Sequence, residues 1–181
     1  MVQVALGLLL FAGVHLWKRL LPAGRARLGQ PGKGIVAVGS IAGIWLMARG
    51  VGAWEGGEMW AAPGWARPVN NLLMVVAVYL FAASLLRPEA ARRLRHPQLL
   101  AVALWAVAHL LVNADLATVL LFGGLLLWAV AEMALINRAQ PAWTPPPPAG
   151  WGREALTAGA AVLALLAIGW VHAWLGYWPW G

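Results

Sequence analysis

Six long apolar segments dominate the chain, and short polar loops separate each segment from the next. A helix needs about 20 apolar residues to cross a bilayer core, and open strands cannot cross it because their backbone groups would stay unpaired. The composition suits lipid, since 62% of the 181 residues are hydrophobic and only 10% are charged. We therefore predict a single domain over residues 1–181, an all-α polytopic transmembrane helical bundle. Its five to six spanning helices are expected at about residues 2–21, 34–48, 70–86, 97–113, 115–136 and 155–177, of which the second and fourth are short.

The basic residues lie almost entirely in alternate loops. The 13 lysines and arginines outnumber six acidic residues and give a net charge of +7, and eleven of the 13 fall in loops 18–33, 87–96 and 137–154. The positive-inside rule makes these loops cytoplasmic, so both termini are expected on the opposite side of the membrane. Headgroup contact accounts for the charge, and we expect a lipid bilayer rather than nucleic acid as the partner. Tryptophans, which prefer the membrane interface, gather in the expected outer segments as Trp54, Trp60, Trp65, Trp174, Trp178 and Trp180.

Three local patterns indicate how the helices are joined. The linker 141–150 contains four consecutive prolines, which favour a stiff polyproline spacer. Gly39 and Gly43 are spaced for close contact between helices. The fourth and fifth segments are joined by almost nothing, so we expect a tight helical hairpin in which Asn113 or Asp115 caps the later helix.

Cysteine is absent, which excludes disulfides and thiolate ligands. The N-terminal apolar run has no basic leader, and its charges follow the run. We therefore expect it to be retained as the first helix rather than removed as a signal peptide.

Four histidines are the candidate functional residues, because an ionisable side chain within a membrane helix is costly and by default suggests a function. His96 precedes Pro97, so we expect it just outside the fourth helix, at the headgroups. His15, His109 and His172 lie within the first, fourth and sixth spans. Burial favours neutral imidazole, whose lone pair can bind a metal. For each histidine alone, a hydrogen-bonded packing role is the alternative.

The surroundings of these histidines favour haem b as the cofactor. Carboxylates are nearly absent from the spans, with Glu132 near the end of the fifth and Asp115 at a turn. Zinc, di-iron and calcium sites use cysteines, carboxylates or closely spaced histidines. Haem brings four nitrogens of its own and needs only one or two imidazoles. Depth along the helices leaves the ligand pair open, since His109 and His172 match each other better than His15 and His109 do.

Several stretches resemble the NnrU family of bacterial membrane proteins. They are FAGVHLWKRLLP, KGIVAVGSIAGIWLMARG, RHPQLLAVALWAVAHLLVNADLATVLLFGGLLLWAVAE and VHAWLGYWP, and all four histidines lie within them. The resemblance covers about residues 7–178 and is most specific over 95–132. It implies a bacterial inner membrane location, with periplasmic termini by the charge pattern, and a link to denitrification and nitric oxide metabolism.

A plant relative of this family, the 15-cis-zeta-carotene isomerase, is understood to use haem b with histidine ligation. Carried over by motif, the resemblance implies that His15 and His109 are the metal ligands. Where the isomerase has a cysteine three residues before the second ligand, this chain has Ala106, so a cysteine-for-histidine ligand switch is not available. We expect His172 as a substitute or distal group, Trp105 packed on the porphyrin and Asn113 beside His109.

Three functions remain open. The first is a haem-b protein with a redox or sensing role, which suits iron held by two histidines. The second is a haem-dependent cis–trans isomerase of an apolar polyene, which needs one ligand to leave. The third is a non-enzymatic scaffold or assembly factor of a membrane redox complex. RHPQL also resembles the start of the isoprenylcysteine methyltransferase motif, but Leu99 replaces its tyrosine, so we do not expect methyl transfer. A homo-oligomer remains open.

Overall fold

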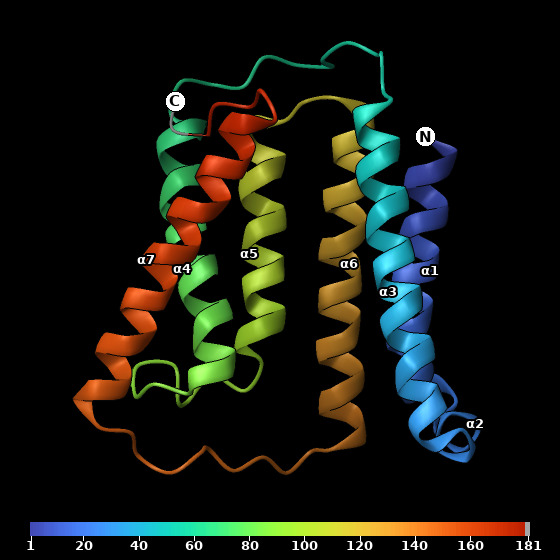
Figure 1. Cartoon of the computed structure of the whole chain (residues 1–181), viewed down its shortest axis with the longest axis vertical. Helices are drawn as coiled ribbons and strands as arrows, with labels where there is room; N and C mark the ends of the chain where they lie inside the picture. The colour runs from blue at the N-terminus through green and yellow to red at the C-terminus, as the bar shows by residue number, and fades with distance from the viewer. Residues whose placement is uncertain (180–181) are drawn as a thin grey trace. The chain divides into compact units, whose positions relative to one another are not determined.

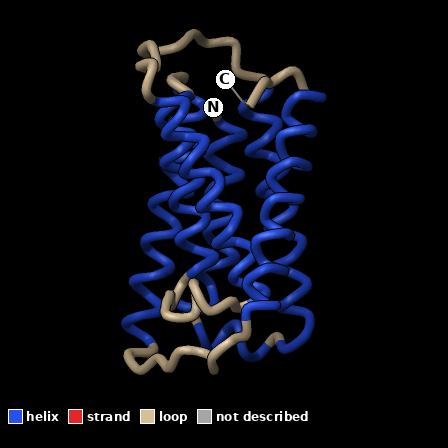
Figure 2. The backbone as a smooth tube through the Cα atoms, turned by 90° about the vertical axis from the view of Figure 1, so that its left-hand side faces the viewer, coloured by secondary structure: helices blue, strands red, loops and turns tan. Residues whose placement is uncertain are grey.

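The computed structural model describes residues 1–179, and over that range it contains seven helices and no strand (Figures 1 and 2). The all-α class is therefore confirmed. Trp180, expected at the outer interface, lies outside the described residues. The helices are α1 (Val2–Leu20), α2 (Pro22–Arg27), α3 (Gly29–Gly52), α4 (Ala66–Leu86), α5 (Pro97–Val112), α6 (Leu116–Ala139) and α7 (Trp151–Trp174).

Six of these helices correspond to the six predicted apolar segments. Four of them, α3, α4, α6 and α7, are long and apolar enough to cross a membrane. The apolar helix α5 is shorter, with 16 residues, and α1 has 19 residues and carries Lys18 and Arg19 in its last turn. The predicted count of five to six spans agrees with this set.

Two details of the helix bounds differ from expectation. Helix α3 has 24 residues, so the second segment is not short. Its ends contain glycines and Arg49, which lower the hydropathy there without ending the helix. The short helix α2 within loop 18–33 was not expected; Pro22 occupies its first position, where the missing N–H of proline costs nothing.

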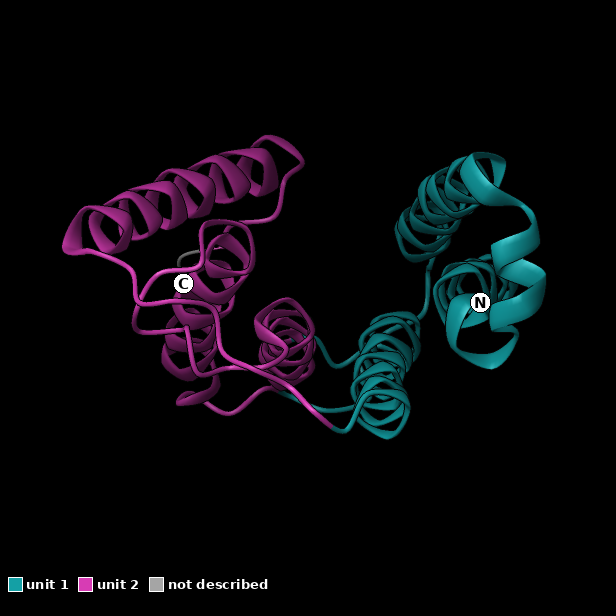
Figure 3. Ribbon diagram, turned by 90° about the horizontal axis from the view of Figure 1, so that it is seen from below, with its two compact units in different colours: residues 1–61, 113–141 teal, residues 62–112, 142–181 magenta. Residues whose placement is uncertain are grey.

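The chain divides into two compact units, each built on three long helices (Figure 3). Unit 1 comprises Met1–Ala61 and Asn113–Pro141, and contains α1, α2, α3 and α6. Unit 2 comprises Ala62–Val112 and the chain from Ala142 onward, and contains α4, α5 and α7. The single domain inferred from the sequence stays a prediction.

In unit 1, α1 and α3 run antiparallel and approach so closely that glycines form the contact (Figure 1). A Cβ atom on Gly43 would lie 2.9 Å from the carbonyl oxygen of Gly7 and 3.0 Å from Cβ of Phe11. A Cβ atom on Gly39 would lie 2.6 Å from a methyl group of Val14. The predicted role of Gly39 and Gly43 in close helix contact is therefore confirmed.

Helix α6 completes unit 1 by packing on α1 and α3. It starts with a full N-cap: the Asp115 carboxylate accepts hydrogen bonds from the backbone N–H groups of Ala117 and Thr118, both at 3.0 Å. Of the two residues expected to cap this helix, the structure selects Asp115. Nearby, the Met59 N–H donates to the Ala114 carbonyl at 2.9 Å, which ties the loop after α3 to the start of α6.

In unit 2, α4 packs on both α5 and α7. Unit 2 has a buried hydrophobic cluster made of one leucine and three alanines. They are Leu80 and Ala83 of α4, Ala91 of the following loop and Ala101 of α5. Many large apolar side chains of both units face outward, including Leu9, Ile41, Leu127 and Leu163, each 69% exposed or more. Such a surface suits a hydrocarbon solvent, in which apolar exposure carries no penalty.

Two carboxylates bind the segments at one end of unit 2 together. Glu154, in the first turn of α7, accepts hydrogen bonds from the Tyr79 hydroxyl and, at 3.1 Å, from the Ala90 N–H. Glu89 accepts from the Ala149 N–H at 3.1 Å and from the Arg92 guanidinium at 2.8 Å. The proline-rich linker is thereby attached to the loop between α4 and α5.

Candidate functional site

His15 lies in unit 1 on α1, in a cluster of aromatic rings. Its Nδ1 is 2.8 Å from the carbonyl oxygen of Phe11, one turn earlier. The ring centroid is 4.3 Å from that of Phe11 and 5.2 Å from that of Trp128 on α6, whose ring meets it edge-on at 72°. The imidazole is thus held by its own helix and packed by two aromatic side chains.

One turn beyond this cluster lies a charged pair that the sequence analysis did not identify. Arg19 Nε donates to Glu132 Oε1 at 2.8 Å, and the side chains are 20% and 9% exposed. Because Arg19 follows His15 by four residues and Glu132 follows Trp128 by four, the two contacts stack along one face of α1 and α6. Two features of the sequence could have indicated this ion pair. Glu132 is a lone carboxylate in an apolar segment, and basic residues end the first apolar segment.

Two buried polar atoms in this stack have no hydrogen-bond partner among the described residues, the indole Nε1 of Trp128 and Oε2 of Glu132. One is a donor and the other an acceptor, and their side chains lie one turn apart on α6. Buried polar groups are nearly always paired, with protein or ordered water.

His109 lies in unit 2 on α5 and is held in the same manner as His15. Its Nδ1 is 3.0 Å from the Trp105 carbonyl oxygen. The indole of Trp105 meets its ring edge-on, with centroids 5.6 Å apart at 71°. Trp105 thus contacts the histidine itself, and its predicted contact with a porphyrin stays a prediction.

His172 lies toward the C-terminal end of α7, in the same unit as His109. Its Nδ1 is 2.8 Å from the Ile168 carbonyl oxygen. Counted from the middle of their helices, His109 lies roughly 7 Å and His172 roughly 14 Å toward the C-terminal end. Both histidines thus belong to unit 2, on two helices that each pack on α4.

The three histidines within helices share one geometry that defines their tautomer. A carbonyl oxygen can only accept, so each Nδ1 carries the proton that it donates to the residue four positions earlier. In the neutral ring the lone pair then lies on Nε2, the nitrogen farthest from the helix backbone. This arrangement orients an imidazole for metal ligation, in the way that a hydrogen bond to the other ring nitrogen does in metalloproteins.

The remaining predicted site residues lie at helix ends. His96 immediately precedes α5, as expected, and its carbonyl accepts from the Leu100 N–H at 2.9 Å. Asn113 follows the last residue of α5. Its predicted place beside His109 stays a prediction.

Over residues 1–179 no group of three or more His, Cys, Asp or Glu side chains is placed to hold a metal ion. A haem needs fewer protein ligands, because the porphyrin supplies four nitrogens. The donor set that the chain does offer, single imidazoles with the lone pair on Nε2, fits an axial position.

Outside the spans, one titratable group is clearly perturbed. The hydrogen bond from the Ala149 N–H, followed by that from the Arg92 guanidinium, holds the pKa of Glu89 below its ordinary value of 4.5. The attachment of the linker therefore depends on a carboxylate that stays ionised to lower pH than usual.

The long apolar helices and their outward-facing leucines and isoleucines define a multi-pass helical membrane protein. The family model of the NnrU protein matches residues 3–179, so the chain belongs to the NnrU family. The resemblance found in the sequence is thereby confirmed over nearly the whole chain. Comparisons with curated proteins and with solved structures gave no match.

Proposed function

We propose that this NnrU-family protein binds haem b through His109 and serves a redox or sensing role in the nitrogen-oxide metabolism of a bacterial inner membrane. The observation that carries the proposal is the hydrogen bond between His109 Nδ1 and the Trp105 carbonyl, which leaves the imidazole lone pair on Nε2. His15 and His172 have the same bond and the same tautomer.

Either of these two histidines would hold the haem together with His109. The family resemblance implies His15, which is already oriented by Phe11 and packed by Trp128. His172 is the alternative, because it belongs to the same unit as His109 and has the same Nδ1 hydrogen bond. Single substitutions distinguish the two.

Bound haem would supply one-electron chemistry at iron. The chain would contribute the orientation of the imidazoles, because each Nδ1–H bond holds the ring on its helix and increases the basicity of Nε2. The apolar surroundings would exclude water and set the dielectric that tunes the potential. Ligation by two histidines would favour electron transfer or sensing over turnover.

An absorption spectrum tests this proposal. The protein is purified in mild detergent from cells supplied with haem, and reduced-minus-oxidised spectra are recorded for the wild type and four single variants. We expect a Soret band and an α-band in the wild type and their loss in His109→Ala. Loss or a marked shift in either His15→Ala or His172→Ala identifies the second ligand, and addition of nitric oxide to the reduced protein should alter the Soret band.

His96→Ala is the matched control, because His96 lies outside α5 and its loss should leave the spectrum unchanged. Absence of haem bands in the wild type would exclude the proposal. Unchanged bands in His109→Ala would exclude His109 as the ligand.

A further inference from the structure

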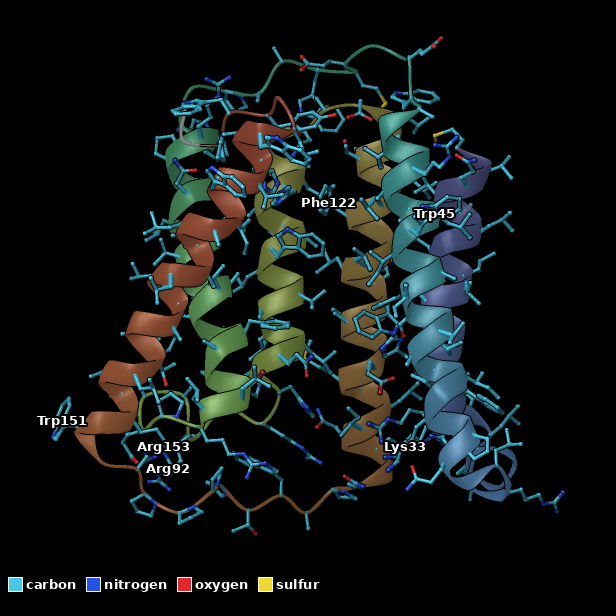
Figure 4. All side chains as sticks on the ribbon, in the orientation of Figure 1. Lys33, Trp45, Arg92, Phe122, Trp151 and Arg153 are labelled. Carbon is cyan, nitrogen blue, oxygen red and sulfur yellow. The ribbon has the colours of Figure 1, made fainter. Side chains whose placement is uncertain are left out.

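A cavity of about 400 Å³ lies within unit 2, where α4 ends and α5 begins. Three arginines line it, together with Trp143 and Thr144 of the proline-rich linker. Its volume falls within the range of roughly 300–1,000 Å³ usual for small-molecule sites. The arginines come from the loop between the two helices, and Figure 4 shows Arg92 at this end of the unit, above the linker.

The electrostatics of the cavity favour an anion. Arg87, Arg92 and Arg95 contribute guanidinium groups, and no carboxylate is among the described residues that line it. Glu89 offsets one of these charges through its ion pair with Arg92. Pro97, the first residue of α5, also lines the cavity, so the positive end of that helix adds to the field.

Arg87 occupies a backbone conformation that an arginine rarely adopts. Its φ of 52° and ψ of 59° lie in the left-handed region, where it ends α4. Glycine or asparagine is the usual residue at such a helix end, because other side chains are strained there. A residue held in this region needs support from the structure around it, and the Arg87 side chain lies in the cavity lining.

Two hydrogen bonds hold the linker at the cavity. Arg92 Nη1 donates to the Pro146 carbonyl at 3.2 Å, and the Ala149 N–H donates to Glu89 at 3.1 Å. These bonds hold Trp143 and Thr144 at the cavity, where they provide an apolar surface and a hydroxyl donor. The site therefore combines charged, polar and apolar groups on two segments far apart in the chain.

We propose that this cavity binds a phosphate ester, with Arg87 contacting the phosphate and Trp143 contacting the apolar part of the ligand. Guanidinium groups match phosphate oxygens through paired hydrogen bonds. The cavity exceeds what a bare phosphate fills, which indicates an ester. This site lies apart from the histidines on α5 and α7, requires no haem, and goes beyond the proposed function.

Two binding experiments on the full chain identify the source of the phosphate. In the first, radiolabelled glycerol 3-phosphate is added to the detergent-purified protein in equilibrium dialysis. In the second, the protein is reconstituted in vesicles of equal phosphatidylglycerol and phosphatidylcholine, released, and examined by native mass spectrometry for retained lipid. Saturable binding of glycerol 3-phosphate assigns a soluble ester, and preferential retention of phosphatidylglycerol assigns a lipid headgroup.

A matched pair of substitutions tests the site itself. Arg87→Gln and Arg93→Gln each remove one positive charge from the same loop, but only Arg87 lines the cavity. We expect Arg87→Gln to weaken binding about tenfold or more and Arg93→Gln to change it less than about twofold. Arg87→Gly should weaken binding equally while the melting temperature stays unchanged or rises, because glycine suits the left-handed conformation. Equal effects of Arg87→Gln and Arg93→Gln, or no binding in either experiment, would overturn the proposal.

Discussion

Arg19 of α1 and Glu132 of α6 form an ion pair at 2.8 Å, although 113 residues separate them in the chain. The pair lies one turn from the contact between His15 and Trp128, so the same faces of α1 and α6 carry both contacts. This relationship makes unit 1 sensitive to either charge.

Glu132→Ala should destabilise the protein by about 3 kcal/mol, because removing one partner of a buried pair leaves an uncompensated charge. The measurement is the midpoint of unfolding in mixed micelles of increasing denaturing detergent. The double variant Arg19→Leu, Glu132→Leu should recover most of the loss, since two apolar residues leave no buried charge. A double variant as unstable as Glu132→Ala would contradict this explanation.

Gly43→Ala should destabilise the contact between α1 and α3 by about 1–3 kcal/mol. Its added Cβ would meet backbone atoms, the Gly7 oxygen at 2.9 Å and the Phe11 nitrogen at 3.1 Å, which cannot move aside as a flexible side chain can. Gly34→Ala on the same helix is the control, because a Cβ there has nothing within 4 Å. Equal melting temperatures of the two variants in detergent would show that the close approach is unimportant.

Asp115→Ala should cost about 1 kcal/mol by removing the N-cap of α6. The carboxylate accepts from the N–H groups of Ala117 and Thr118, and its other oxygen accepts from the Thr118 hydroxyl at 2.7 Å. Asp115→Asn should retain most of the stability, because an amide oxygen caps nearly as well. Hydrogen exchange at the first turn of α6 reports the effect, and unchanged protection in Asp115→Ala would refute the capping role.

The attachment of the linker should weaken at acidic pH. The pKa of Glu89 is lowered from 4.5 in the folded protein, so its contribution is present above the unfolded pKa and is lost as the pH falls through the folded value. Exchange of the Ala149 amide, corrected for its intrinsic rate, should therefore increase as the pH falls below the ordinary range of a glutamate carboxyl group. In Glu89→Gln the corrected exchange should be fast and independent of pH, and a pH-dependent rate in that variant would contradict the assignment.

The helices and several of their ends could be predicted because each depends on local chemistry. Proline after His96 sets the start of α5, and Asp115 caps α6. The spacing of Gly39 and Gly43 predicted a close contact between helices, because glycines on one helix face let the backbone of another helix approach. The extent of α3 was underestimated, since glycine-rich helix ends have low hydropathy but remain helical when packed.

The partners of these helices were not predictable in the same way. Pairing Arg19 with Glu132 requires knowledge of which faces of α1 and α6 meet, and hydropathy is nearly uniform around α6. The histidines were recognisable as candidates from their type and place, but their tautomer follows from hydrogen-bond geometry. The arginine-lined cavity forms only when the linker folds back on the loop between α4 and α5. These segments are far apart in the chain, so the sequence pattern of neither segment indicates the cavity.

The two units are interleaved along the chain, and this has a consequence for biosynthesis. The hairpin of α1 and α3 can form as soon as both have left the ribosome, but α6 is made only after α4 and α5. Until then Arg19 remains in the nascent protein without its carboxylate, and insertion must keep that guanidinium hydrated or at the headgroups. Insertion of α6 is thus the step that allows α1 and α3 to reach their final positions in unit 1.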